Sequence, residues 1–192
     1  MRYKDKAMQK PSPEALASVN AAILKATEEH RPVRILFVCL GNICRSPAAE
    51  GMMRQKAKEA GISIELDSAG FYGGHAGDLP DRRMREAAWQ RGLRLDHHSR
   101  TVRPSDYDYF DLLVGMDDNN INSLLREAPT LEAEQKIIRM SDFAVDHPSA
   151  DSIPDPYWEG AAGFHLVLDL LDDACEHLLI PIRSYSPDSM SL

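Results

Sequence analysis

The stretch that decides the fold runs from Val33 to Pro47 and reads VRILFVCLGNICRSP. Its first six residues are rich in β-branched and aromatic side chains, which predicts a buried strand of the parallel type. After Cys39 the chain turns polar for a few residues and contains one glycine, and Ser46-Pro47 is typical of a helix start. The stretch therefore predicts a strand, a tight loop and a helix in succession.

The alternation of strands and helices continues along the rest of the chain. Gly61 is expected to end the helix that follows the loop. Further strands are expected at residues 62–70, 111–117 and 136–140, and further helices at 81–92, 119–128 and 161–179. The sequence therefore predicts an α/β domain in which an open parallel sheet is covered by helices on both faces, with a ligand crevice at the carboxyl ends of the strands.

The chain has 192 residues, enough for one compact domain with an extension. Residues 1–32 form the predicted extension, because Ser12-Pro13-Glu14 is typical of a helix start and Pro32 ends the segment. The domain itself is assigned to residues 33–180, and residues 181–192 are expected to form a tail. The helix of the extension has apolar residues at helical spacing, which predicts one packing face: Leu16, Val19, Ile23 and Leu24.

The composition is that of a globular protein, with 43% hydrophobic and 27% charged residues. The 22 lysines and arginines are outnumbered by 30 aspartates and glutamates, and the net charge of −8 argues against nucleic acid or a membrane as a partner. Three cysteines are too few for a disulfide framework and indicate a reducing compartment. Because no export signal or membrane anchor is recognisable near the N-terminus, a cytoplasmic location is expected. The sequence indicates no oligomeric state.

The loop after the first strand carries the residues that indicate chemistry. Cys39 and Arg45 are close enough in sequence to form the two ends of one tight loop above a helix N-terminus. The backbone N–H groups of such a loop bind an oxyanion, and an arginine fork matches two phosphate oxygens. The same positive potential favours the nucleophilic thiolate of Cys39. Ser46 is placed to cap the helix and donate to the sulfur, and Asn42 can adopt a left-handed backbone and brace the loop.

Several motifs along the chain share a common order. CLGNICRSP stands at residues 39–47 and DPYW at 155–158. Between them lie SAG at 68–70, HAG at 75–77, DHHSR at 96–100 and FDLLVGMD at 110–117. With these motifs the chain resembles the low-molecular-weight protein tyrosine phosphatases over about residues 33–180. The resemblance implies a four-stranded parallel sheet with the phosphate-binding loop after the first strand, no metal or other cofactor, and phosphotyrosine-containing proteins as substrates.

The resemblance also assigns roles to individual residues. It makes Cys39 the nucleophile that forms a phosphocysteine, Arg45 the phosphate clamp, Ser46 the stabiliser of the thiolate and Asp155 the general acid. In the same way, Asn42, Ser68 and His97 form a hydrogen-bond network that holds the loop. The loop residues expected to bind the substrate are Leu40, Gly41, Asn42, Ile43, Cys44 and Ser46. The predicted activity is the hydrolysis of phosphotyrosine and other aryl phosphates.

The proline-rich loop at residues 141–160 has two candidates for the general acid. A phenolate leaving group needs a proton, and an aspartate on a stiff loop can hold one over the pocket. Spacing favours Asp155, in DPYW, and leaves Asp151 as the competing acid. The resemblance adds to the preference for Asp155.

The walls of the cleft are expected to differ from each other. Tyr157 and Trp158 can line one side against an aryl substrate. The family often has an aromatic residue where this chain has Gly74. The opposite wall is therefore expected to be bare unless Phe71 or Tyr72 swings in.

Three alternative functions share features with this loop. Arsenate reductases use a similar loop but need further cysteines for disulfide exchange, and residues 68–100 contain none. Protein arginine phosphatases characteristically have threonine where this chain has Ile43. A phosphotyrosine-binding module without catalysis is disfavoured because every chemical position is present. No cysteine and histidine spacing around His97, His98 or His147 matches a zinc signature, so no metal site is expected.

Cys44 introduces a prediction of redox control. It lies five residues after Cys39 in a curled loop, which can bring two Cα atoms to disulfide distance. Peroxide attacks a thiolate to give a sulfenic acid that a neighbouring thiol can capture. The sequence therefore predicts reversible inactivation through a Cys39–Cys44 disulfide. The alternative is that Cys44 is only a small apolar side chain supporting the loop.

Overall fold

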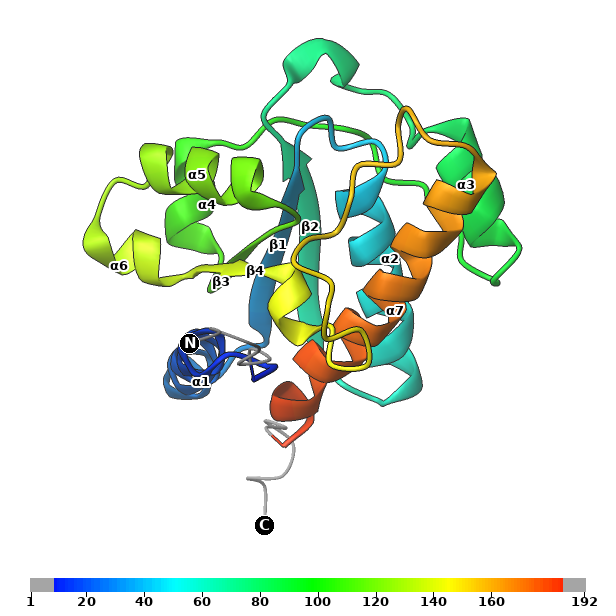
Figure 1. Cartoon of the computed structure of the whole chain (residues 1–192). Helices are drawn as coiled ribbons and strands as arrows, with labels where there is room; N and C mark the ends of the chain where they lie inside the picture. Colours follow the sequence, from blue (N-terminus) through cyan, green and yellow to red (C-terminus); the bar gives the residue numbers. More distant parts are fainter. Residues whose placement is uncertain (1–8, 185–192) are drawn as a thin grey trace, which may run out of the picture.

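The computed structural model describes residues 9–184, and Figure 1 shows a sheet with helices on both of its faces. The four strands are β1 (Val33–Cys39), β2 (Ile64–Gly70), β3 (Leu112–Gly115) and β4 (Ile137–Arg139). All of them are parallel, and their order across the sheet is β2-β1-β3-β4. The predicted α/β fold with a four-stranded parallel sheet is confirmed.

The central strand β1 is buried on both faces. Ile35 and Phe37 belong to a core shared with helices on one face, and Leu36 and Val38 belong to a second core on the other. The first face is covered by α2 (Arg45–Glu59), α3 (Arg82–Trp89) and α7 (Ala161–Arg183). The second is covered by α4 (Pro104–Tyr109), α5 (Asp118–Glu127) and α6 (Leu131–Gln135). A strand covered on both faces is apolar at its buried positions, which explains the run ILFV, whereas Arg34 near the start of the strand is only partly buried.

The helix of the extension, α1 (Pro13–Glu28), begins as predicted. Ser12 is its N-cap and accepts a hydrogen bond of 3.2 Å from the N–H of Ala15. The predicted packing face is wrong in part, because Leu24 is 59% exposed. The fully buried face consists of Ala15, Val19, Ala22 and Ala26. Small side chains let the helix lie close to α7 and the sheet, and they join the same core as α2 and α7.

Two helix ends also differ from the prediction. Ser46 does not cap α2, because the helix begins at Arg45, two residues earlier than a Ser46 cap requires, and Cys44 occupies the N-cap position. The last helix does not stop before Pro181 but continues to Arg183. Proline removes one N–H from a helix, yet Ile182 is 1% exposed, and its packing holds the last turn in place. The remainder of the expected tail, residues 185–192, lies outside the described residues, as do residues 1–8.

Four short elements were not predicted: α4, α6, and the two 3₁₀ turns η1 (Gly73–His75) and η2 (Met140–Phe143). Each is too short for its residues to repeat along one face, so periodicity gives no signal. Among the described residues, no helix is both long and apolar enough to cross a membrane.

The sheet brings the predicted loop to the carboxyl ends of β1 and β2. There the loop passes so close to Gly70 that an added Cβ would lie 2.6 Å from the carbonyl oxygen of Leu40 and 2.8 Å from the nitrogen of Asn42. Only glycine permits this approach. The close contact joins the loop to β2, where its supporting residues lie.

Candidate active site

The loop at residues 40–44 turns its carbonyl groups outward. The carbonyls of Leu40, Gly41 and Ile43 accept hydrogen bonds of 2.7–3.2 Å from residues outside the loop. Because the C=O and N–H of one peptide unit point in opposite directions, the N–H groups that follow these carbonyls face the inside of the loop. The α2 N-terminus lies beneath it. The arrangement is suited to an oxyanion.

Asn42 holds the loop from its centre. Its φ is +53°, the left-handed backbone expected of it. The side-chain N–H₂ donates to the hydroxyls of Ser46 (2.8 Å) and Ser68 (3.0 Å), and the side-chain oxygen accepts from the N–H of Arg100 (2.9 Å). The same oxygen lies 2.9 Å from Nε2 of His97, which must carry the donated proton because the oxygen can only accept. The hydrogen bonds that the resemblance implied are present.

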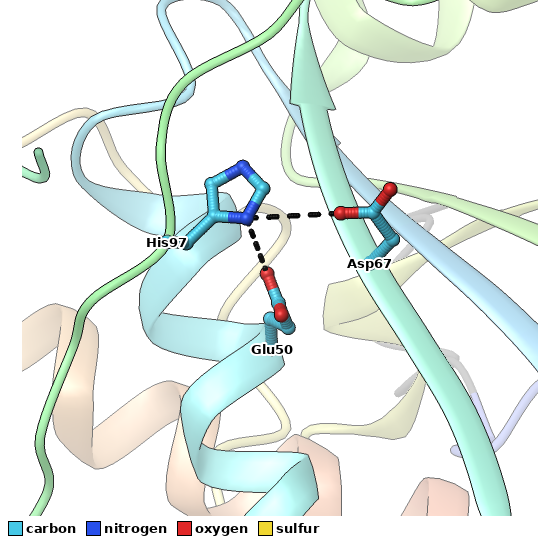
Figure 2. Close-up of side chains that lie close together, drawn as sticks. All are labelled: Glu50, Asp67 and His97. Atoms are coloured by element: carbon cyan, nitrogen blue, oxygen red, sulfur yellow. Dashed lines mark ion pairs between the residues drawn. The ribbon is translucent and has the colours of Figure 1, made fainter. Parts of the chain in front are cut away.

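A pair of carboxylates continues this network behind His97 (Figure 2). Nδ1 of the ring lies 3.2 Å from Glu50 and 3.7 Å from Asp67, and the hydroxyl of Ser68 donates to Glu50 at 2.8 Å. The sequence interpretation missed Glu50 and Asp67. The signal for Glu50 was a charged residue within the otherwise apolar AAEGMM of the predicted helix.

Cys39 ends β1 and is 2% exposed. Its sulfur lies 3.0 Å from the hydroxyl oxygen of Ser46. Asn42 donates to the Ser46 hydroxyl oxygen, so the hydroxyl proton of Ser46 is free to point at the sulfur. The other acceptor near this hydroxyl, the carbonyl oxygen of Ala69, is farther away at 3.4 Å. This geometry suits a hydroxyl that stabilises a thiolate.

Arg45 lies at the floor of the site and is 2% exposed. Its guanidinium donates to Asp117 at 2.5 Å, to the carbonyl of Ile153 at 3.2 Å and to Asp155 at 3.2 Å. Burial opposes the charge on Arg45, but Cys39 and the two carboxylates outweigh it and raise the pKa of the guanidinium above its usual value. Arg45 is therefore a fixed positive charge next to the cysteine.

Asp117 was not among the predicted site residues. It follows β3 and caps α5, where one oxygen accepts the N–H of Asn120 at 2.9 Å and the other binds Arg45. The signal was available in the sequence, because an acidic residue at the carboxyl end of a parallel strand lies at the ligand crevice.

A cavity of about 400 Å³ opens above Cys39 and Arg45. Asp155 lies on it, with one oxygen oriented by the N–H of Tyr157 at 3.1 Å, whereas Asp151 does not line it. The predicted substrate-binding residues that line the cavity are Leu40, Gly41, Ile43, Cys44, Tyr157 and Trp158. Asn42 and Ser46 do not line it, since their side chains bond behind the loop.

The wall opposite Tyr157 is not bare. Tyr72 lines the cavity beside His75, and their rings meet edge to face at 5.4 Å. A Cβ on Gly74 would lie 2.3 Å from atoms of the Tyr72 ring. The absence of a side chain at Gly74 thus makes room for an aromatic ring supplied two residues earlier.

Cys44 is a free, buried cysteine on the cavity. Burial, reinforced by the charge of Asp81, raises the pKa of its thiol well above the usual value. Cys175 is also free and buried, but it lies in α7 and does not line the cavity.

An open parallel α/β sheet whose first strand leads into an oxyanion loop bounded by a cysteine and an arginine defines a class of oxyanion-binding enzymes that includes the phosphatases and the arsenate reductases. The comparisons are more specific. The profile of the family described as low molecular weight phosphotyrosine protein phosphatase matches residues 34–186. This chain belongs to that family of hydrolases, and the resemblance is confirmed.

Relatives and solved structures agree with this assignment. A putative low molecular weight protein-tyrosine-phosphatase of Synechocystis sp. is 43% identical over 149 residues, which cover 77% of this chain and 94% of the relative. The crystal structure of a protein tyrosine phosphatase from Entamoeba histolytica, with Hepes in its active site, is similar at a TM-score of 0.76 and 42% identity over 79% of this chain and 97% of that one. A Drosophila arginine phosphatase is similar at a TM-score of 0.73 and 29% identity over 79% of this chain and 99% of that one.

Proposed function

We propose that this chain hydrolyses phosphotyrosine in proteins through a phosphocysteine intermediate on Cys39, with Asp155 as the general acid. One observation carries the proposal: Cys39, Arg45 and Asp155 converge on one cavity in which Arg45 bonds Asp155. A nucleophile, a fixed cation and a proton donor thus surround the place where the loop N–H groups converge.

In the first step, the phosphate of the substrate binds the loop N–H groups and Arg45, and it displaces Asp155 from the guanidinium. The Cys39 thiolate then attacks phosphorus as the bond from phosphorus to the phenolic oxygen breaks. The displaced Asp155 carboxylate takes up a proton from solvent and gives it to that oxygen, and neutral tyrosine leaves. The loop and Arg45 stabilise the charge on the phosphoryl oxygens throughout.

In the second step, water attacks the phosphorus of the phosphocysteine. Asp155, now ionised, takes a proton from this water, and inorganic phosphate is released. Cys39 leaves as a thiolate, stabilised by the Ser46 hydroxyl 3.0 Å away. Asn42 and His97 hold Ser46 and the loop in place for both steps.

The preference for tyrosine follows from the walls of the cavity. Tyr72, Tyr157 and Trp158 supply aromatic surface, and Ile43 supplies an apolar one. Such a lining suits a phenyl ring better than the polar guanidinium of phosphoarginine. We infer that phosphotyrosine proteins, not phosphoarginine proteins, are the substrates.

The test compares phosphotyrosine, phosphoserine and phosphoarginine peptides side by side, together with p-nitrophenyl phosphate. Turnover of the tyrosine peptide and the aryl ester is expected. Cys39→Ser should have no measurable turnover but should still bind phosphate, whereas Cys175→Ser, a matched loss of a thiol outside the cavity, should stay active. An active Cys39→Ser variant would exclude the phosphocysteine, and faster turnover of phosphoarginine would exclude the substrate assignment.

Redox control and location are further parts of this proposal. Cys44 lines the same cavity as Cys39, so a sulfenic acid formed on Cys39 by peroxide lies near a second thiol. Attack by Cys44 on the sulfenic sulfur releases water and leaves a disulfide, which a dithiol reduces. All three cysteines are free thiols, which fits a reducing compartment such as the cytoplasm.

A further inference from the structure

A second cluster of ionisable side chains joins the loop after η2 to the C-terminal half of α7. Asp173 on α7 is 7% exposed. Its Oδ2 accepts hydrogen bonds from the N–H groups of Asp146 (3.0 Å) and His147 (3.1 Å) and lies 2.8 Å from Nδ1 of the His147 ring. One carboxylate oxygen therefore has three partners and fixes the orientation of the side chain.

The other oxygen of Asp173, Oδ1, is buried and has no hydrogen-bond partner. Nδ1 of His177 lies 2.8 Å from it but is aligned with the main-chain carbonyl of Asp173, at 3.0 Å. A buried polar atom without a partner costs about 1–3 kcal/mol, and more when it is charged. A cation bound to Oδ1 would remove this cost.

Asp146 completes a set of three donors. The ligand atoms of Asp146, Asp173 and His177 all lie within 4.8 Å of one another. One imidazole and two carboxylates suit Zn²⁺, which binds such atoms at about 2.0–2.2 Å. The 2.8 Å between Asp173 and His177 allows both to reach one ion, and Asp146 is exposed, so its side chain can turn toward them.

We propose that Asp146, Asp173 and His177 form a zinc site that ties the loop after η2 to α7, with water as the fourth ligand. On binding, the proton of Nδ1 of His177 passes to solvent and its lone pair goes to the metal. His147 and the two N–H groups on Oδ2 hold the Asp173 ligand from behind, as outer partners do in metal sites.

The cluster behind the phosphate-binding loop is different. There every carboxylate oxygen of Glu50 and Asp67 already accepts a hydrogen bond, from Arg54, Ser68 or Arg100. At Glu50 and Asp67, hydrogen bonds satisfy all four carboxylate oxygens. At Asp173 they satisfy Oδ2 but leave Oδ1 without a donor.

The test measures zinc by equilibrium dialysis of the full chain, free of any affinity tag, and follows Co²⁺ uptake by its visible absorption. Asp146→Asn and His177→Gln should each weaken the affinity for one Zn²⁺ at least about tenfold. They should also lose the rise in melting temperature that Zn²⁺ gives the wild type. His165→Gln, a matched change on the same helix, should behave as the wild type. Circular dichroism checks that each variant is folded.

Two results would overturn the proposal. If wild-type protein and Asp146→Asn take up the same number of zinc ions with the same affinity, any zinc is bound elsewhere, for example by the thiols of the cavity. If the wild type takes up none, His177 alone is the partner of Asp173 and no metal site exists.

Discussion

Replacing Asp155 by asparagine separates two effects of this carboxyl group. Asparagine keeps the size of the side chain and can still accept the N–H of Tyr157, but it has no acidic proton. General acid catalysis contributes about 10²–10⁴ in rate, so kcat for phosphotyrosine should fall by that factor. For p-nitrophenyl phosphate the loss should be far smaller, because its leaving group departs readily without a proton.

The same substitution should tighten the binding of phosphate. Asp155 lies 3.2 Å from a guanidinium nitrogen of Arg45, and the Asp155 side chain is 43% exposed. An ion pair with so exposed a partner is worth about 0.2–1 kcal/mol. Phosphate must displace this carboxylate, so removing the negative charge should lower the inhibition constant of inorganic phosphate by about 1.4- to 5-fold, at 1.4 kcal/mol per factor of ten.

The assay is steady-state kinetics on both substrates with inorganic phosphate as the inhibitor. Asp151→Asn is the matched control, since Asp151 is in the same loop but does not line the cavity. Equal losses on the two substrates, or weaker phosphate inhibition in Asp155→Asn, would refute the reasoning. A selective loss in Asp151→Asn would reassign the acid.

Three further predictions concern the loop and the walls of the cavity. Arg45→Lys should lower kcat/KM by about 10²–10³, because the point charge of an ammonium group cannot replace the bidentate hydrogen bonding of the guanidinium. An unchanged kcat/KM would show that Arg45 is only structural. Gly74→Ala should push the Tyr72 ring out of the cavity, and Tyr72→Ala should remove it. An aromatic pair contributes about 0.5–1.5 kcal/mol, so KM for a phosphotyrosine peptide should rise about 2- to 12-fold in each variant. An unaltered KM in both variants would show that Tyr72 is not part of the binding surface. After peroxide and then dithiothreitol, the wild type should regain activity and Cys44→Ser should not, and equal recovery would exclude Cys44 as the protecting thiol.

The parts of the site that were predictable are those carried by neighbouring residues. Cys39, Asn42, Arg45 and Ser46 lie in one short stretch between a strand and a helix, so local chemistry indicated their arrangement. Asp117 comes from another strand and meets Arg45 only because β1 and β3 are adjacent in the sheet. Its contact depends on strand order, which the residues around it do not specify.

Packing decided two other features. The buried face of α1 is the one with alanines, because closeness to the sheet matters more there than the size of each side chain. Tyr72 reaches the cavity because Gly74 leaves room for its ring, and this depends on a steric relation between two residues of one turn. Neither the buried face of α1 nor the position of the Tyr72 ring can be predicted from hydrophobic periodicity or composition.

The alanine face of α1 bears on how this protein is best produced and shortened. By sequence alone, Val33 is the obvious place to start a minimal version, since the family profile begins at residue 34. Removing α1 in this way would expose the apolar residues of α7 and the sheet against which α1 packs. The uncovered apolar surface would favour aggregation in expression and crystallisation trials. A trimmed version would need polar replacements on the exposed side of α7 to stay dispersed.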